Sequence, residues 1–262
     1  MREVLRGLRE LGHEMTYCVG LRLDRGLIFM SDTRTNAGVD NISSFRKMYT
    51  WEKPGDRLIT LLSAGNLATT QAVVSMLEER TKAVEHREPD IYEVPSMFKA
   101  AKLVGDTVRG VIREIADGGL QSESSFGATF ILGGQIAGGK TRMFMIYPEG
   151  NFIEATDDNP FFQIGEHKYG KPILVRAYDP AMTFEEAAKL LIVSFDSTQK
   201  SNLSVGLPID IQTYEVDSLK LGAEKRLQAN DPYYVNISEG WSEALREAFQ
   251  SLPAYDEINR RD

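Results

Sequence analysis

The alternation of apolar and polar residues predicts strands followed by two helices in the first half of the chain. Apolar runs on both sides of Asp24-Arg25-Gly26 predict a β-hairpin that starts near Met15. A further strand is expected over 56–62. Helices are expected from Asn66, a suitable N-cap, to about residue 84, and again over 94–117, where valine and isoleucine recur on one helical face.

The second half of the chain carries the same two kinds of pattern. Three strand-like runs are separated by glycine-rich or Pro-Glu-Gly turns, at 128–132, 142–147 and 151–156. Thr183-Phe184-Glu185-Glu186 is a capping box, which opens a helix to about Gln199. A strand is expected over 209–219 and a last helix from about 238 to 252, before a polar tail.

The order of these elements indicates how they pack. Blocks of strands joined by hairpins and separated by blocks of helices favour antiparallel sheets with helices layered outside them. We find no Pro/Gly/Ser-rich linker that would separate two domains and no repeat of fixed period.

Composition narrows the class of protein. The chain has 262 residues, of which 42% are apolar, so it can bury a substantial core. A net charge of −8 argues against binding nucleic acid through its phosphates. One cysteine, Cys18, excludes an internal disulfide framework and fits a reducing compartment. No apolar run approaches the roughly 20 residues of a membrane span, and charges interrupt the N-terminal segment. We therefore expect a cytoplasmic protein with neither nucleic-acid nor membrane partners.

The histidines do not indicate a metal site. His13, His86 and His167 each neighbour a glutamate but lack His-x-x-x-His spacing, and they are more typical of surface or structural positions. No metal and no other cofactor is expected.

Residues 134–141, GQIAGGKT, match the phosphate-loop expression of nucleotide-binding proteins. A working phosphate loop needs a helix that starts at its Lys-Thr, because the N-terminus of that helix faces the anion. The residues that follow, Arg142 to Tyr147, are instead strand formers that end at Pro148. A hairpin loop explains the glycines better, and a phosphate-loop NTPase is a minor alternative.

Three residues in the first fifty carry the candidate chemistry. Thr16 begins the first strand, Asp32 ends the second, and Lys47 lies on the next segment. Each alone has an ordinary explanation as a strand former, a turn residue and a surface charge.

Together with several longer strings these residues resemble the proteasome β-subunit family of N-terminal nucleophile hydrolases, and within it the bacterial branch called Anbu. The strings are MTYCVGLRLDRGLIFMSDTRTNAG, FRKM, LLSAGNLATTQ, QIGEHKYGKPIL and SFDSTQKSNLSVGLPIDI, which extend from Met15 to about Ile211. The resemblance implies an α+β fold, a four-layer αββα sandwich. It also implies hydrolysis of peptides or unfolded proteins and self-association into a large homo-oligomer around a sequestered cavity.

The resemblance assigns catalytic roles to matching positions. A threonine hydroxyl needs a base within hydrogen-bond reach, and the α-amine of an N-terminal threonine can serve as that base. Thr16 would be the nucleophile, Lys47 the cation that lowers the proton affinity of its amine and hydroxyl, and Asp32 the carboxylate that orients Lys47. The backbone N–H of Gly65 would stabilise the oxyanion.

The chain departs from the family pattern at two positions. The family places an aspartate and a serine around the N-terminal amine, where this chain has Ser201 and Ser204. Ser204 matches the serine, whereas Ser201 replaces the aspartate. Glu166 stands where the family has a serine. By the same matching, Thr35, Ser63 and Leu67 would line the substrate pocket.

The mechanism requires Thr16 at the N-terminus, although fifteen residues precede it. Residues 1–14 can form a short amphipathic helix. We expect 1–15 to be an extension and 16–262 the peptidase domain. The extension is either a propeptide removed by self-cleavage or the result of a start assigned upstream of Met15, and we favour the second.

Two further alternatives remain open at this point. A non-catalytic ring subunit would share the fold, although the joint presence of Thr16, Asp32 and Lys47 argues against it. An amidohydrolase that acts on a small amide would share the chemistry and differ in substrate. The sequence leaves open whether an ATP-driven unfoldase feeds the assembly, and whether the assembly is a ring or an open helix.

Overall fold

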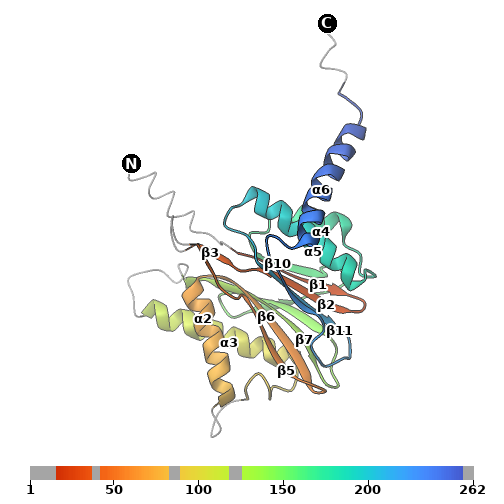
Figure 1. Cartoon of the computed structure of the whole chain (residues 1–262). Helices are drawn as coiled ribbons and strands as arrows, with labels where there is room; N and C mark the ends of the chain where they lie inside the picture. Colours follow the sequence, from red (N-terminus) through yellow and green to blue (C-terminus); the bar gives the residue numbers. More distant parts are fainter. Residues whose placement is uncertain (1–15, 37–41, 83–88, 118–125, 256–262) are drawn as a thin grey trace, which may run out of the picture.

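A computed structural model describes residues 16–36, 42–82, 89–117 and 126–255. Two antiparallel sheets are stacked face to face, and helices cover the outer face of each (Figure 1).

The first sheet joins strands from both halves of the chain. Its order is β10-β1-β2-β11-β12. The hairpin of β1 and β2 lies inside it, and β10 pairs with β1 while β11 pairs with β2. The bounds are β1 Tyr17–Leu23, β2 Gly26–Asp32, β10 Phe161–Gly165, β11 Ile209–Glu215 and β12 Glu224–Leu227.

The second sheet is a meander of consecutive strands in the order β5-β6-β7-β8-β9. Its bounds are β5 Met48–Lys53, β6 Arg57–Gly65, β7 Ala128–Ile136, β8 Arg142–Ile146 and β9 Phe152–Glu154. A separate two-stranded ribbon, β3 Arg34–Asn36 and β4 Ile42–Ser44, leads from the first sheet to the second.

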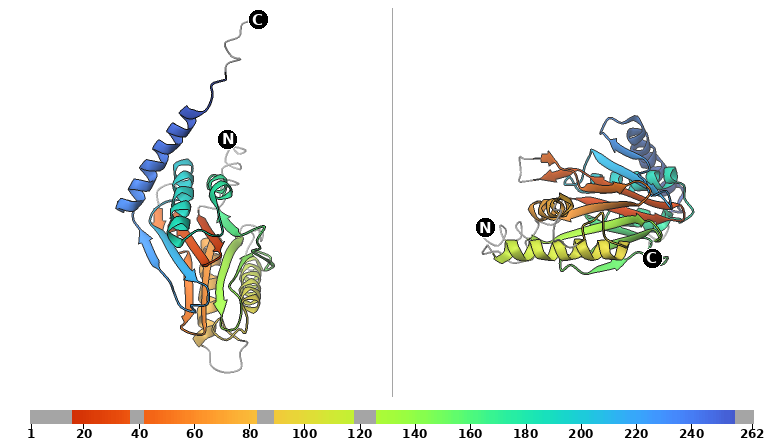
Figure 2. Two further views of the ribbon diagram at one scale, coloured as in Figure 1. Left: turned by 90° about the vertical axis from the view of Figure 1, so that its right-hand side faces the viewer. Right: turned by 90° about the horizontal axis from the view of Figure 1, so that it is seen from below.

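The helices form the two outer layers. The second sheet is covered by α2, Leu67–Lys82, and α3, Met97–Asp117. The first sheet is covered by α4, Lys171–Ala177, and α5, Phe184–Ser201, while α6, Pro232–Ser251, packs on α5 at its start and then extends away from the sandwich (Figure 2). Across the described residues, every helix is too short or too polar to cross a lipid bilayer.

Buried side chains form three apolar clusters, one between each pair of adjacent layers. Leu61, Val104 and Phe130 belong to the cluster between α2, α3 and the second sheet. Phe29, Leu62 and Ile131 belong to the cluster between the sheets. Val19, Leu191 and Phe195 belong to the cluster between the first sheet and its helices. Because each sheet is apolar on both faces, the chain needs four layers to bury it, and the expected α+β sandwich of αββα type is confirmed.

Local sequence signals are confirmed where they are strong. The hairpin turns at Asp24 and Arg25, with Leu23 paired to Gly26. Asn66 Oδ1 accepts the backbone N–H of Thr69 at 3.1 Å and so caps α2. Thr183 and Glu186 form the predicted capping box at the start of α5.

Other boundaries were wrong. Strands β6 and β7 run longer than expected, and the strand predicted over 209–219 ends at Glu215, since Asp217 and Leu219 adopt positive φ in a turn. Helix α6 begins earlier than residue 238, because Asp231 accepts the N–H groups of Tyr233 and Tyr234 and caps it. The prediction missed five short elements, namely β3, β4, β5, β10 and β12, and also the seven-residue α4. The helix predicted over 1–14 lies outside the described residues.

The segment that matches a phosphate loop is a hairpin connection. Gly134 still belongs to β7, Gly138 adopts a φ of +77°, and β8 begins at Arg142. No helix starts at Lys140-Thr141, which are among the described residues. The geometry that would hold a nucleotide phosphate is therefore absent from this segment.

Candidate active site

Thr16 lies immediately before β1, where strand β10 fixes its backbone. Only 6% of its surface is exposed. Its carbonyl oxygen accepts the backbone N–H of Glu166 at 2.7 Å, next to the pairing of Tyr17 with Gly165. Gly165 has a φ of +79°, and a Cβ atom there would lie 2.0 Å from the carbonyl oxygen of Thr16. Glycine at this position therefore lets β10 approach the start of β1.

A buried ion pair lies beside the same point. Lys47 Nζ donates to Asp32 Oδ1 at 2.8 Å and to the carbonyl oxygen of Arg34 at 2.5 Å. The same Oδ1 atom accepts the backbone N–H of Tyr17 at 3.0 Å, so the carboxylate is tied to the residue directly after Thr16. The side chains of Lys47 and Asp32 are 6% and 0% exposed. The fold thus places a cation and a carboxylate next to the candidate nucleophile.

Burial controls the charge of this pair. It raises the pKa of the Asp32 carboxyl to about 6, because loss of water outweighs the opposing charge and hydrogen bond of Lys47. The carboxyl is then mostly ionised at neutral pH and becomes neutral in mildly acidic solution. Removing one member would leave the other charge buried without its counter-ion, which costs about 3–5 kcal/mol of folding stability.

The single cysteine lies close to this pair but is not suited to act as a nucleophile. Cys18 is fully buried, and its thiol donates to the carbonyl oxygen of Ser63 at 3.5 Å. Burial and the neighbouring Asp32 charge raise the pKa of the Cys18 thiol well above its usual range. The reactive thiolate is therefore not formed at neutral pH.

Gly65 occupies the turn between β6 and α2. Its φ is +109°, and a Cβ atom there would lie 2.5 Å from the carbonyl oxygen of Gly127. The residue is exposed, and α2 begins two residues later at Leu67. A turn of this kind, at the positive end of a helix, can present a backbone N–H to a negatively charged oxygen.

The structure connects Glu166 to Ser204 through Asn202, which the sequence analysis did not single out. Asn202 Nδ2 donates to Glu166 Oε2 at 3.1 Å, and Asn202 Oδ1 accepts the backbone N–H of Ser204 at 2.9 Å. Since the N–H of Glu166 is bonded to Thr16, the network reaches the candidate nucleophile. Asn202 lies in the segment that was matched to the family's aspartate and serine. The direction of its side chain, however, depends on how α5 ends.

Ser201 is placed differently from expectation. It is the exposed last residue of α5, and its hydroxyl donates to the carbonyl oxygen of Ser197 in the same helix at 3.0 Å. The hydrogen bond to Glu166 comes from Asn202 instead. The predicted role of Ser201 at the N-terminal amine stays a prediction.

The three expected pocket residues flank the ion pair and the glycine turn. The backbone N–H of Ser63 donates to the carbonyl oxygen of Lys47 at 3.0 Å. Thr35 follows Arg34, whose carbonyl oxygen accepts from Lys47. Leu67 is half-buried two residues after Gly65. All three therefore lie within one or two residues of a group that the proposed chemistry uses.

The arrangement provides a buried hydroxyl, a cation held by a carboxylate and a glycine turn next to a helix N-terminus. These groups suit nucleophilic attack on a carbonyl carbon with stabilisation of the resulting oxyanion. Within 16–36, 42–82, 89–117 and 126–255, no three His, Cys, Asp or Glu side chains are grouped to hold a metal ion.

Comparison with known proteins agrees with this geometry. A family model described as proteasome subunit matches residues 15–213. A comparison with curated protein sequences gave no match.

Three solved structures illustrate the similarity. Anbu from Hyphomicrobium sp. strain MC1 is 53% identical, with a TM-score of 0.84 over 92% of this chain and 100% of that one. Anbu from Yersinia bercovieri, an ancestral β-subunit, is 47% identical, with a TM-score of 0.85 over 92% and 99%. The helical assembly of the Anbu complex from Pseudomonas aeruginosa is 43% identical, with a TM-score of 0.86 over 94% and 100%. By fold, by family model and by these identities over nearly whole chains, the protein belongs to the proteasome subunit family and is similar to its Anbu members.

Proposed function

We propose that the protein is a threonine peptidase whose nucleophile is the hydroxyl of an N-terminal Thr16. The observation that supports this most directly is the buried Lys47–Asp32 pair, tied to the backbone next to Thr16. Burying a cation costs desolvation free energy. A positive charge beside a hydroxyl that must lose a proton favours that loss, which gives the buried lysine a function.

In the proposed reaction, every step before the final hydrolysis is carried out by a group of the chain itself. The α-amine of Thr16 takes the proton of its own hydroxyl, and the oxygen attacks the peptide carbonyl carbon. The positive charge of Lys47 lowers the proton affinity of both groups. The N–H of Gly65 donates to the oxyanion, which typically contributes about 3 kcal/mol. The intermediate collapses to an ester on Thr16 as the protonated α-amine returns its proton to the leaving amine, and water then hydrolyses the ester.

Glu166, Asn202 and Ser204 hold the backbone around Thr16. Glu166 anchors the carbonyl group of Thr16, and Asn202 anchors Glu166. We assign these residues to positioning the α-amine. Ser201 and the pocket residues Thr35, Ser63 and Leu67 keep the roles expected from the sequence as part of this proposal.

The proposal requires that Thr16 becomes the first residue. Mass spectrometry and N-terminal sequencing of protein made from its own gene are expected to find Thr16 at the N-terminus. Assembled protein that still begins at Met1 would contradict the mechanism.

A peptide-hydrolysis assay on protein that starts at Thr16 tests the activity. Replacing the nucleophile in Thr16→Ala should lower kcat/KM by about 10³-fold or more, and Lys47→Ala by about 10²-fold. Lys99→Ala, which removes an exposed lysine from α3, is the matched control and should keep full activity. Activity that survives Thr16→Ala would refute the assignment of Thr16 as the nucleophile. Turnover of small amides without peptide cleavage would favour an amidohydrolase instead.

We also propose that copies of the chain associate with one another. A relative that is 43% identical is known as a helical assembly. In this chain the outer half of α6 and its C-cap residue expose Leu245, Phe249 and Leu252, which are 49%, 76% and 66% exposed. An apolar stripe of this kind on a projecting helix is typical of a contact with another subunit.

A further inference from the structure

A cavity opens beside Thr16, on the side away from the Lys47–Asp32 pair. Its volume is about 350 Å³, within the range of small-ligand sites. Gly165, which lines it, packs against Thr16. Thr129, on the opposite wall, pairs with Ala64 next to Gly65. The cavity is therefore adjacent to both the proposed nucleophile and the proposed oxyanion site.

The order of strands separates this cavity from the expected pocket. In the first sheet β1 lies between β10, which lines the cavity, and β2, which carries Asp32. The pocket residues Thr35 and Ser63 lie near Lys47, on the β2 side. A peptide that crosses Thr16 from the pocket would continue into the cavity.

The cavity follows the free edge of β10. It touches all five residues of 161–165. Because successive side chains of a strand point to opposite faces, only a space along the strand edge can touch all five. In the described part of the chain β10 pairs with β1 alone. An extended peptide can add to such an edge through backbone hydrogen bonds.

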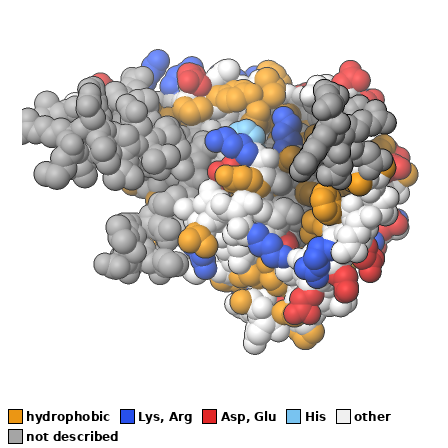
Figure 3. Space-filling view, turned by 90° about the horizontal axis from the view of Figure 1, so that it is seen from above, with side chains coloured by type: hydrophobic (Ala, Val, Ile, Leu, Met, Phe, Trp, Pro, Cys, Tyr) orange, Lys and Arg blue, Asp and Glu red, His pale blue; other side chains and the backbone are white. Residues whose placement is uncertain are grey.

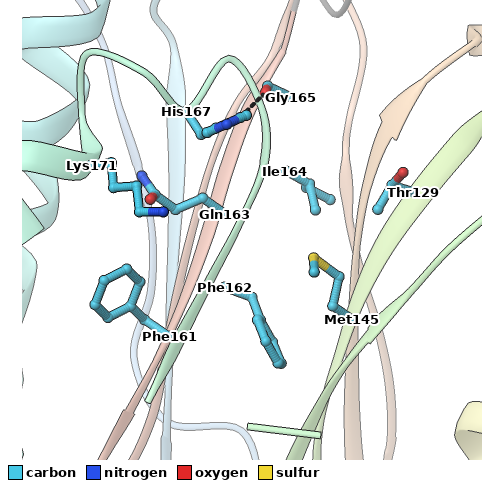
Figure 4. A pocket seen from close by; sticks show the side chains of 9 residues that line it. All are labelled: Thr129, Met145, Phe161, Phe162, Gln163, Ile164, Gly165, His167 and Lys171. Atoms are coloured by element: carbon cyan, nitrogen blue, oxygen red, sulfur yellow. Dashed lines mark hydrogen bonds between the residues drawn. The ribbon is translucent and has the colours of Figure 1, made fainter. Parts of the chain in front are cut away.

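The side chains give the cavity an apolar floor and a basic rim. Figure 4 shows Phe162 and Ile164 at its centre, Met145 on one side, and Lys171 and His167 on the other. No acidic side chain is among the described residues that line it. Viewed from above, a histidine on the surface is bordered by Lys or Arg side chains with hydrophobic side chains close by (Figure 3).

The histidine is held in a defined orientation. Its Nδ1 atom lies 3.1 Å from the carbonyl oxygen of Gly165. A carbonyl oxygen can only accept, so this bond requires the proton on Nδ1, and Nε2 of the neutral ring is then an acceptor. The donors for an anionic group come from Lys171, at the start of α4, which supplies three N–H groups and a positive charge.

We propose that this cavity binds the part of a peptide substrate that follows the scissile bond, extended along β10, with a carboxylate side chain facing Lys171. The inference rests on the proposed peptidase function and adds a preference for an acidic residue in the leaving peptide.

Binding to protein that starts at residue 16 and carries Thr16→Ala tests this without turnover. Fluorescein-labelled hexapeptides would carry one glutamate at the first, second or third position, each beside a matching glutamine peptide, and Kd would be measured by fluorescence anisotropy. At one position at least, glutamate should bind about three- to fivefold more tightly than glutamine, as expected for a solvent-accessible charge pair. Lys171→Glu should abolish or reverse this preference.

Lys168→Glu is the matched control. Lys168 is exposed and three residues away, and it does not line the cavity, so the preference should persist in this variant. Equal binding of all glutamate and glutamine peptides, or a preference that survives Lys171→Glu, would overturn the inference. Hydrolysis by the unsubstituted protein is measured separately, so a lack of activity refutes the proposed function and leaves the binding result to decide on the cavity.

Discussion

Lys47 and Asp32 show how a single buried pair can set the chemistry of a neighbouring residue. Asp32 Oδ1 accepts hydrogen bonds from two donors, Lys47 Nζ and the backbone N–H of Tyr17. It thereby fixes the cation relative to the backbone at Thr16. Desolvation raises the pKa of Asp32, while Lys47 opposes the rise. The Asp32 carboxylate therefore keeps its charge at neutral pH and loses it in mild acid.

This sensitivity predicts an unusual pH profile for kcat/KM. The α-amine base must be unprotonated, so log(kcat/KM) should fall with a slope of about one below the pKa of that amine. Protonation of Asp32 should add a second unit of slope below about pH 6. Steady-state kinetics from pH 5 to 8 check this expectation. A slope that stays near one down to pH 5 would contradict it.

The raised pKa of the same carboxyl predicts that folding stability changes with pH in the direction opposite to kcat/KM. A pKa raised from 3.8 to about 6 means that the native state binds the proton more tightly than the unfolded state. The free energy of unfolding, compared with that of Asp32→Asn, should therefore fall by about 2 kcal/mol as the pH rises from 4 to 6. Urea unfolding of both proteins measures the difference, and a difference that rises with pH would show that the sign is wrong.

At the scale of elements, the approach of β10 to β1 positions Thr16. Gly165→Ala should place a methyl group against the carbonyl oxygen of Thr16 and lower kcat by about 10²-fold, because small displacements of a reacting group are costly. Gly138→Ala is the matched control. Its φ of +77° imposes similar backbone strain, about 1 kcal/mol, but a Cβ atom there meets nothing within 4 Å. Activity assays should find only Gly165→Ala impaired. An equal loss of activity in both variants would show that the close approach of β10 does not position Thr16.

The end of α5 is the second element that positions the site. Asn202→Ala should remove the support of Glu166 and lower kcat by about tenfold, with a loss of about 1 kcal/mol in stability. Ser201→Ala should change kcat much less, since its hydroxyl is bonded within its own helix. Kinetics of the two variants check the order of effects. A larger loss in Ser201→Ala would restore the role expected from the family motif.

On the level of the whole molecule, most of α6 projects beyond the four-layer sandwich. Its first turns pack on α5, where Tyr234 is buried and Ser238 donates to Asp196. The helix then leaves the body (Figure 2), and its apolar stripe continues into solvent. If copies associate through this stripe, as proposed, it meets either a different surface of the next copy or the same helix of a partner, and the first arrangement would produce rings or open helices.

Charge on this stripe should weaken the assembly. Leu245→Glu with Phe249→Glu places two carboxylates on exposed apolar positions, which should shift the protein from a large assembly toward single chains. Light scattering after size-exclusion chromatography measures the mass. Gln250→Glu adds charge to the opposite face of the same helix and should leave the assembly intact. Unchanged assembly in the double variant would place the contact elsewhere.

The sequence by itself determined the strong local elements. The β1–β2 hairpin and the caps of α2 and α5 follow from short-range patterns, because turns and caps depend on residues within one or two turns of the chain. Resemblance to a family supplied the candidate residues Thr16, Asp32 and Lys47. It was less informative where this chain departs from the family, at Ser201 and Glu166.

What these residues contact depends on long-range packing. Strand β10 is short, follows Pro160 and ends at Gly165, so local pattern did not reveal it, yet it flanks Thr16 and borders the cavity. Asn202 reaches Glu166 across 36 positions of sequence, and Lys47 reaches Asp32 from the segment just before the first strand of the other sheet. Periodicity specifies which face of a strand is buried. Which strands become neighbours depends on packing energies summed over four layers, and this long-range pairing creates the site.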